Sequence, residues 1–192
     1  ERRFVGFALV CGFAFAAGIV YISVSPFVLE ATYGLSPQRL SLLFGINALG
    51  LAGMAQISAR LAGQVSPRTW LACGVAGISG AGAALLIVTR GGLGLGGVLA
   101  SLFLLVASLG LVAPNATALA LANVDPRQAG SASALLGMLQ MSIGASFAPL
   151  VGLAGSANAV PMAVAIAAFG LATLVAFGAA SWSGSKESPA AG

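Results

Sequence analysis

Few side chains in this 192-residue sequence could act on a substrate, and those few lack the partners that catalysis needs. Ser79 lies in the motif Gly77-Ile78-Ser79-Gly80, but a nucleophilic serine needs a base, normally His, and the sequence contains no His. Glu30 is the acidic residue nearest a predicted membrane span, and we expect it in the loop after the first helix, a weak candidate for proton coupling. No phosphate-binding loop, metal-ligand cluster or paired carboxylate is present. These observations argue against an enzyme, a metal and a cofactor.

Four polar side chains inside long apolar segments are the better candidates for a site. They are Tyr21, Asn47, Asn115 and Gln140. A polar group in hydrocarbon must either find a partner or face a wet cavity. We predict that these four line a substrate cavity. The alternatives are interhelical hydrogen bonding for Asn115, helix packing for Gln140, and an aromatic anchor or ordinary helix packing for Tyr21. The tyrosine ring could also attract a cationic ligand.

The composition requires that these residues sit in membrane-spanning helices. Hydrophobic residues make up 59 % of the chain and charged residues 6 %, against about 25 % charged residues in soluble proteins. The mean hydropathy is +1.04. Eight Lys and Arg residues, not clustered, are too few for a nucleic-acid interface. An all-α membrane protein is therefore predicted.

Charged residues and Ser/Pro/Gly clusters divide the chain into six apolar runs of spanning length. The predicted helices are about 4–29, 39–61, 69–89, 95–122, 129–153 and 159–181, which together form one six-helix domain over residues 1–181. Ser36, Ser66 and Asp125 each precede a proline, a pattern typical of helix N-termini. Residues 182–192 are predicted to form a disordered cytoplasmic tail.

The distribution of basic residues predicts the orientation. The loops on one side of the membrane hold six Lys and Arg residues, and the loops on the other side hold two. Because cytoplasmic loops carry the excess of basic residues, both termini are predicted to be cytoplasmic.

Two prolines and their surroundings suggest an internal repeat. Ser25-Pro26 is followed eleven residues later by Pro37, and Ala113-Pro114 is followed twelve residues later by Pro126. A 3+3 inverted repeat of this kind is common in transporters. Pro26 and Pro114, each inside a predicted helix, are candidate hinges. The polar side chains predict that helices 1, 2, 4 and 5 of the six line the cavity, with helices 3 and 6 outside.

The segment Ser25–Gln38, SPFVLEATYGLSPQ, resembles the corresponding region of Bcr/CflA-type drug-resistance transporters of the major facilitator superfamily. The resemblance continues through Leu43–Gly50, LFGINALG, and Ala132–Gln140, ASALLGMLQ. It implies a twelve-helix fold of which this chain looks like the C-terminal half, in a bacterial inner membrane. It also implies proton-coupled efflux of drugs or metabolites.

The partners follow from that resemblance and from the polar side chains. A half-transporter would need the missing N-terminal six-helix half, or a second copy of itself, because Asn47, Asn115 and Gln140 would otherwise face lipid unpaired. Its other partners would be a small amphipathic substrate, protons and the bilayer. The alternatives are a non-transporting helical assembly module and an exporter of another small metabolite in the same superfamily.

Overall fold

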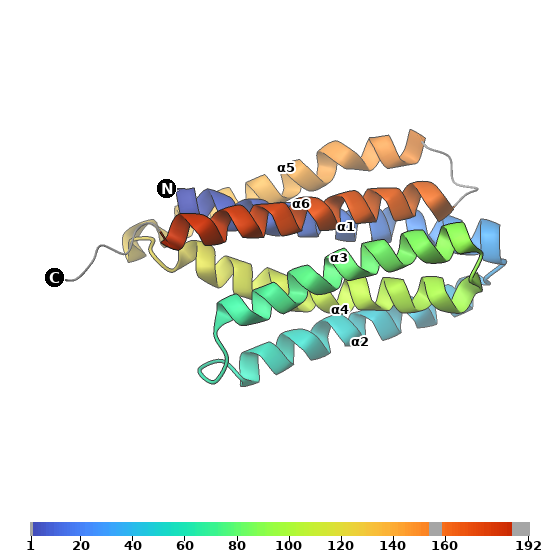
Figure 1. Cartoon of the computed structure of the whole chain (residues 1–192), viewed down its shortest axis with the longest axis horizontal. Helices are drawn as coiled ribbons and strands as arrows, with labels where there is room; N and C mark the ends of the chain where they lie inside the picture. The colour runs from blue at the N-terminus through green and yellow to red at the C-terminus, as the bar shows by residue number, and fades with distance from the viewer. Residues whose placement is uncertain (1, 154–158, 186–192) are drawn as a thin grey trace.

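The structure is a computed structural model that describes residues 2–153 and 159–185. Six long helices run roughly antiparallel to their chain neighbours (Figure 1). They are α1 (Arg2–Tyr33), α2 (Pro37–Arg60), α3 (Pro67–Gly91), α4 (Gly94–Leu121), α5 (Ala129–Leu153) and α6 (Ala159–Ser185), with a 3₁₀ turn, η1, at Pro126–Gln128. Within the described residues, the one β feature is an isolated bridge between Ala62 and Val65. The predicted all-α class is confirmed.

Five of these helices are long and apolar enough to cross a membrane, counted over the described residues. They are α1, α2, α3, α4 and α6. The sixth helix, α5, is 25 residues long, and its role as a span stays a prediction.

Three helix starts have the capping chemistry that the sequence indicates. The Ser36 hydroxyl accepts a hydrogen bond from the backbone N–H of Arg39, and the Ser66 hydroxyl accepts one from Thr69 at 3.1 Å. The Asp125 carboxylate accepts one from the backbone N–H of Arg127 at 2.8 Å and so begins η1. In each case a proline follows the cap, where its missing N–H costs nothing.

Two expected boundaries are wrong. The first helix continues past residue 29 to Tyr33, so Glu30 is an exposed helical residue and not a loop residue. A charged side chain at the rim of a span can stay in a helix, and the chain turns only at Gly34, which has a φ of 64°. At the other end, α6 continues to Ser185, into the segment predicted as a disordered tail. The rest of that tail, residues 186–192, lies outside the described residues.

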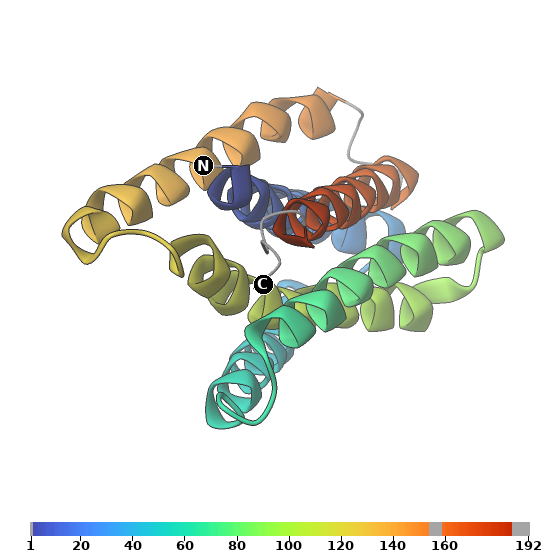
Figure 2. The same ribbon diagram turned by 60° about the vertical axis from the view of Figure 1, so that its left-hand side comes forward.

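The contacts among the six helices are symmetric between the first three helices and the last three. The central helices α1 and α4 contact each other; α1 also packs against α5 and α6, and α4 packs against α2 and α3 (Figure 2). The outer helices α3 and α6 contact each other as well. Exchanging α1 with α4, α2 with α5 and α3 with α6 leaves this list unchanged, which is the pattern that a 3+3 repeat would produce.

Glycines set the close approaches on the α3 side. A Cβ on Gly74 would touch Val112 of α4, and a Cβ on Gly82 would lie 2.7 Å from the Cα of Ala167 in α6. The Ser79 hydroxyl shares its one proton between two carbonyl oxygens, that of Val75 in its own helix and that of Gly170 in α6, each 2.9 Å away. Small residues thus allow backbones to meet where lipid provides no hydrophobic drive between helices. The serine that lies in the Gly-Ile-Ser-Gly motif is part of this contact.

Candidate functional site

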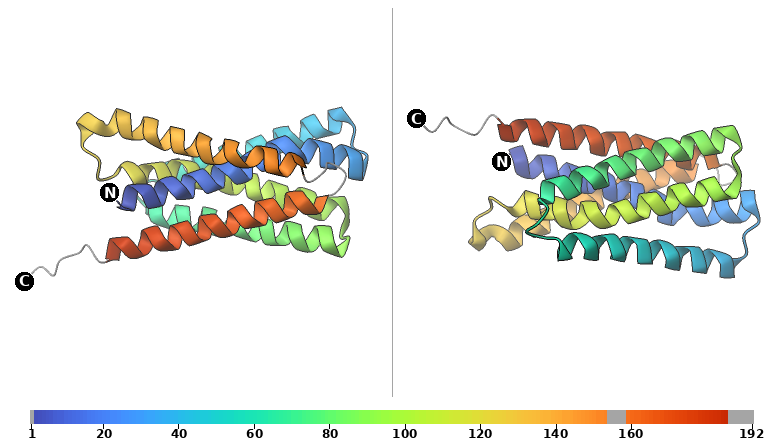
Figure 3. Two further views of the ribbon diagram at one scale, coloured as in Figure 1. Left: turned by 90° about the horizontal axis from the view of Figure 1, so that it is seen from above. Right: turned by 60° about the horizontal axis from the view of Figure 1, so that its bottom comes forward.

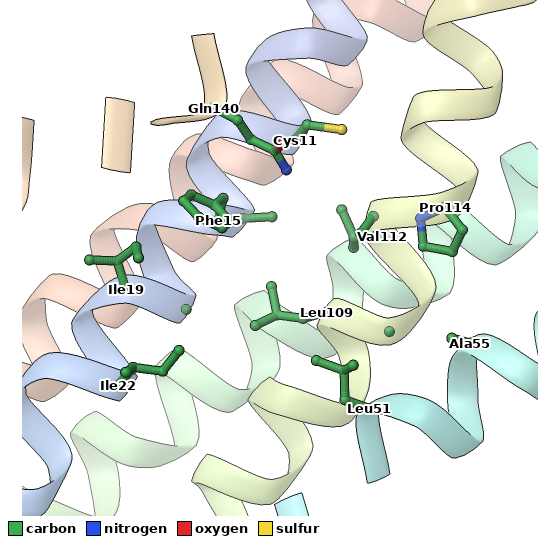
Figure 4. A pocket seen from close by; sticks show the side chains of 14 residues that line it. Cys11, Phe15, Ile19, Ile22, Leu51, Ala55, Leu109, Val112, Pro114 and Gln140 are labelled. Carbon is green, nitrogen blue, oxygen red and sulfur yellow. The ribbon is translucent and has the colours of Figure 1, made fainter. Parts of the chain in front are cut away.

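A groove of about 270 Å³ opens between the central helices and their two flanking helices (Figure 4). It is bounded by the four helices for which the polar side chains predict a common cavity, and not by α3 or α6. The lining residues are Cys11, Ala14, Phe15, Gly18, Ile19 and Ile22 of α1, Leu51 and Ala55 of α2, Leu109, Gly110, Val112, Ala113 and Pro114 of α4, and Gln140 of α5.

The shape of the groove depends on two glycines. A Cβ on Gly18 would lie 3.1 Å from Leu109 across the α1–α4 contact. Gly110 lies directly under the backbone of α2, where an added Cβ would overlap the carbonyl oxygen of Leu51. These contacts bring α1, α2 and α4 close together beside the groove.

Gln140 supplies the amide among the described residues that line the groove. Its side chain extends from α5 toward Cys11 and Phe15 (Figure 4). The other lining side chains are apolar apart from the Cys11 thiol. Such a surface can bind an apolar body by contact and orient one polar group by hydrogen bonding. Of the four predicted cavity residues, Gln140 is the one that lines this groove.

Tyr21 and Asn47 instead bind each other. The Asn47 amide donates a hydrogen bond to the Tyr21 hydroxyl at 2.8 Å, joining α2 to α1. The Tyr21 ring stacks on Phe44, with ring centroids 5.0 Å apart. Both polar residues are buried. They therefore form an interhelical contact in this structure, and for Tyr21 this agrees with the alternative of helix packing.

Asn115 likewise joins two helices, α4 and α2. Its amide nitrogen lies 2.8 Å from the Ser58 hydroxyl of α2 and 2.7 Å from the carbonyl oxygen of Leu111, one turn earlier in α4. The expectation that Asn47 and Asn115 are unpaired without a second bundle is therefore wrong, because each finds a partner within this chain. The neighbouring Pro114 does line the groove.

The remaining candidates lie at the edges of this site. Pro26 lies inside α1 and Pro114 inside α4, and their role as hinges stays a prediction. Each removes the N–H that would pair with the carbonyl four residues earlier. Those carbonyls belong to Ile22 and Gly110, and both residues line the groove. Glu30 lies two turns beyond Ile22 in α1 and does not line it.

Sequence reasoning missed most of the groove wall. Phe15, Ile19 and Ile22 are apolar residues in an apolar helix, so their hydropathy does not distinguish a groove from lipid. One sequence signal could have indicated the groove. Gly110, which has no side chain, lies one turn before Pro114 on the same face of α4, and both residues line the groove.

One relative matches most of the chain. The chain is 38 % identical over 162 residues, 84 % of its length, to a Bacillus subtilis (strain 168) protein named "Uncharacterized MFS-type transporter YdgK". The chain spans 40 % of that protein's length. No family model and no solved structure matches the chain.

Proposed function

We propose that this chain is the C-terminal six-helix half of a secondary active transporter of the major facilitator superfamily, and that the groove is this half's wall of the substrate pathway. The observation that carries the proposal is the position of the groove: it lies between α1, α2, α4 and α5, with one amide, Gln140, on an otherwise apolar surface. The 38 % identity to an MFS-type transporter supports the same family. Proline-containing helices on both sides of the groove fit a protein that changes shape around a bound substrate.

The substrate that fits this wall is small and amphipathic. The apolar residues would contact its body, and the Gln140 amide would meet one polar group. No lysine or arginine lines the groove in the described residues, so this wall offers nothing to neutralise a strongly anionic substrate. Drug or metabolite efflux of the Bcr/CflA type is our proposal for the reaction, with export of another small metabolite as the close alternative.

Proton coupling would draw on residues beyond this groove. No carboxylate lines it among the described residues, and Glu30 is exposed near the end of α1. We therefore assign the proton carrier to the N-terminal half, with Glu30 as a weaker candidate. Because the groove has a wall on one side, we also propose that this chain alone does not transport; it needs the other half or a second copy.

Transport in proteoliposomes tests the groove assignment. The full-length protein would be reconstituted with a pH gradient, and ethidium efflux measured for Gln140→Leu and for the matched control Gln56→Leu. Gln56 is an exposed amide of α2 that does not line the groove. Loss of one hydrogen bond, worth about 1 kcal/mol, should raise the KM of Gln140→Leu about fivefold and leave the control unchanged. Equal KM values for both variants would contradict the assignment.

The same preparation separates a transporter from a non-transporting module. Gradient-driven efflux should appear with the full-length protein and be absent with residues 1–192 alone. Efflux by the 192-residue chain would contradict the half-transporter proposal and make Glu30 the first residue to change. Absence of efflux for a panel of amphipathic dyes with the full-length protein would favour the assembly module.

We propose that the protein lies in the bacterial inner membrane with both termini in the cytoplasm. In a Cys73→Ser background, which removes the exposed native thiol, a membrane-impermeant maleimide added to intact cells should label Leu93→Cys but not Gln64→Cys. Both positions are exposed, and they lie in loops at opposite ends of the bundle. Labelling of Gln64→Cys in place of Leu93→Cys would invert the orientation.

A further inference from the structure

A second groove lies on the surface of the bundle, away from the candidate substrate site. Its volume is about 560 Å³, and it runs between α1 and α6. Leu9 and Phe13 of α1 form one side, and residues of α6 from Ala168 to Ala179 form the other. All of its lining side chains are apolar.

Helices α5 and α6 separate toward the end of the bundle that holds the chain termini, and α1 lies between them there (Figure 3). The groove follows the contact between α1 and α6. Leu171 and Val175 of α6, both lining residues, are 60 % and 64 % exposed. Since α6 is apolar enough to span a membrane, this groove lies at the depth of lipid chains.

The length of the groove matches one leaflet. From Ala168 to Ala179 the α6 axis advances about 16 Å, at a rise of 1.5 Å per residue. One leaflet contributes about 15 Å, half of a 30 Å hydrocarbon core. A single acyl chain can therefore lie along the groove from the membrane surface to the midplane.

The end of the groove near the chain termini has the features of a membrane surface. Gly6 of α1 lies against Ala180, directly after the last lining residue of α6, so the first turn of α1 adjoins this end. That turn carries Arg3, and Trp182 of α6 is 70 % exposed at the same level. Tryptophan is enriched at membrane interfaces, and arginine beside a span attracts anionic headgroups.

We propose that this groove binds one anionic phospholipid of the leaflet on the side of the termini. Its acyl chain lies between α1 and α6, and its headgroup phosphate meets the guanidinium of Arg3. The lipid covers the apolar side chains of α6 that the protein leaves exposed and contacts α1 at Leu9 and Phe13.

Photo-crosslinking with lipids that carry a diazirine in the acyl chain tests this proposal. The full-length protein would be reconstituted in bilayers in which the diazirine-labelled lipid is either phosphatidylglycerol or phosphatidylcholine. Adducts would be mapped by mass spectrometry. We expect adducts in residues 9–13 and 168–179. The ratio of adduct yield with phosphatidylglycerol to adduct yield with phosphatidylcholine should be several-fold higher there than at Ile87. Ile87 is a 66 % exposed residue of α3 that lines neither groove.

Two variants separate chain binding from headgroup binding. Ala172→Leu fills the groove and should reduce its adducts severalfold for both lipids, whereas Ala83→Leu, the same change on an exposed position of α3, should not. Arg3→Gln changes no packing in the groove and should lower the lipid ratio to the value at Ile87. Groove adducts unchanged by Ala172→Leu, or a lipid ratio equal to that at Ile87 in the unmodified protein, would overturn the proposal. The proposal would also be overturned if no adducts form in the groove because another protein segment occupies it.

Discussion

The crossing of α2 over α4 gives the sharpest test of the packing. A Cβ at Gly110 would overlap the carbonyl oxygen of Leu51 and lie 3.1 Å from its carbonyl carbon and 3.2 Å from its Cα. All three atoms are backbone, so no side chain can rotate away. The two helices would have to separate until these contacts reach about 3.5–4 Å. That movement would also lengthen the 2.8 Å hydrogen bond between Asn115 and Ser58.

We therefore predict that Gly110→Ala lowers the free energy of unfolding by about 1–3 kcal/mol. Overpacking costs about 1–3 kcal/mol, the weakened interhelical hydrogen bond adds about 0.6 kcal/mol, and the better helix propensity of alanine returns up to about 1 kcal/mol. SDS titration in mixed micelles, followed by far-UV circular dichroism, measures this difference.

Gly53→Ala in α2 is the matched control. A Cβ added there would meet no neighbouring atom within 4 Å, so only the helix-propensity gain should remain, a stabilisation of up to about 1 kcal/mol. If Gly110→Ala and Gly53→Ala unfold at the same SDS fraction, α2 and α4 do not meet at Gly110.

The same titration tests two other contacts. A double-mutant cycle of Tyr21→Phe and Asn47→Leu should give a coupling energy of about 0.6–1.7 kcal/mol, the range for interhelical hydrogen bonds in membranes. A coupling energy near zero would show that the two side chains do not bind each other. Gly82→Ala should destabilise the protein by about 1–3 kcal/mol because its Cβ would lie 2.7 Å from the Cα of Ala167. Gly80→Ala, which meets nothing within 4 Å, should not; equal effects would refute the α3–α6 contact.

The local features of the fold were readable from the sequence because they depend on neighbouring residues. Ser36, Ser66 and Asp125 act as caps through hydrogen bonds that reach only two or three residues along the chain. The length of the apolar runs and the positions of the charged residues likewise predicted that the chain is all α-helical. Helix ends at the rim were less predictable, because a residue such as Glu30 can be solvated while it remains helical.

The polar site was only partly predictable. Sequence alone fixes the depth of an amide in a span but not its direction, which depends on how the helices turn toward each other. Asn47 faces α1 and Asn115 faces α2, where each amide has a hydrogen-bond partner. Gln140 lines the groove. Nothing in their spacing separates the first two from the third.

The packing of α2 explains why amides occur here without lining a pathway. Its buried residues are Leu40, Asn47 and Ser58, so two of the three are polar. In lipid, apolar burial gives little drive for a helix to join its neighbours, and hydrogen bonds and close contacts must hold it. Asn47 binds α1 and Ser58 binds α4, and between them α2 rests on Gly110. These polar residues therefore position the helix that forms one side of the groove, and a change at either would alter the groove without touching a substrate.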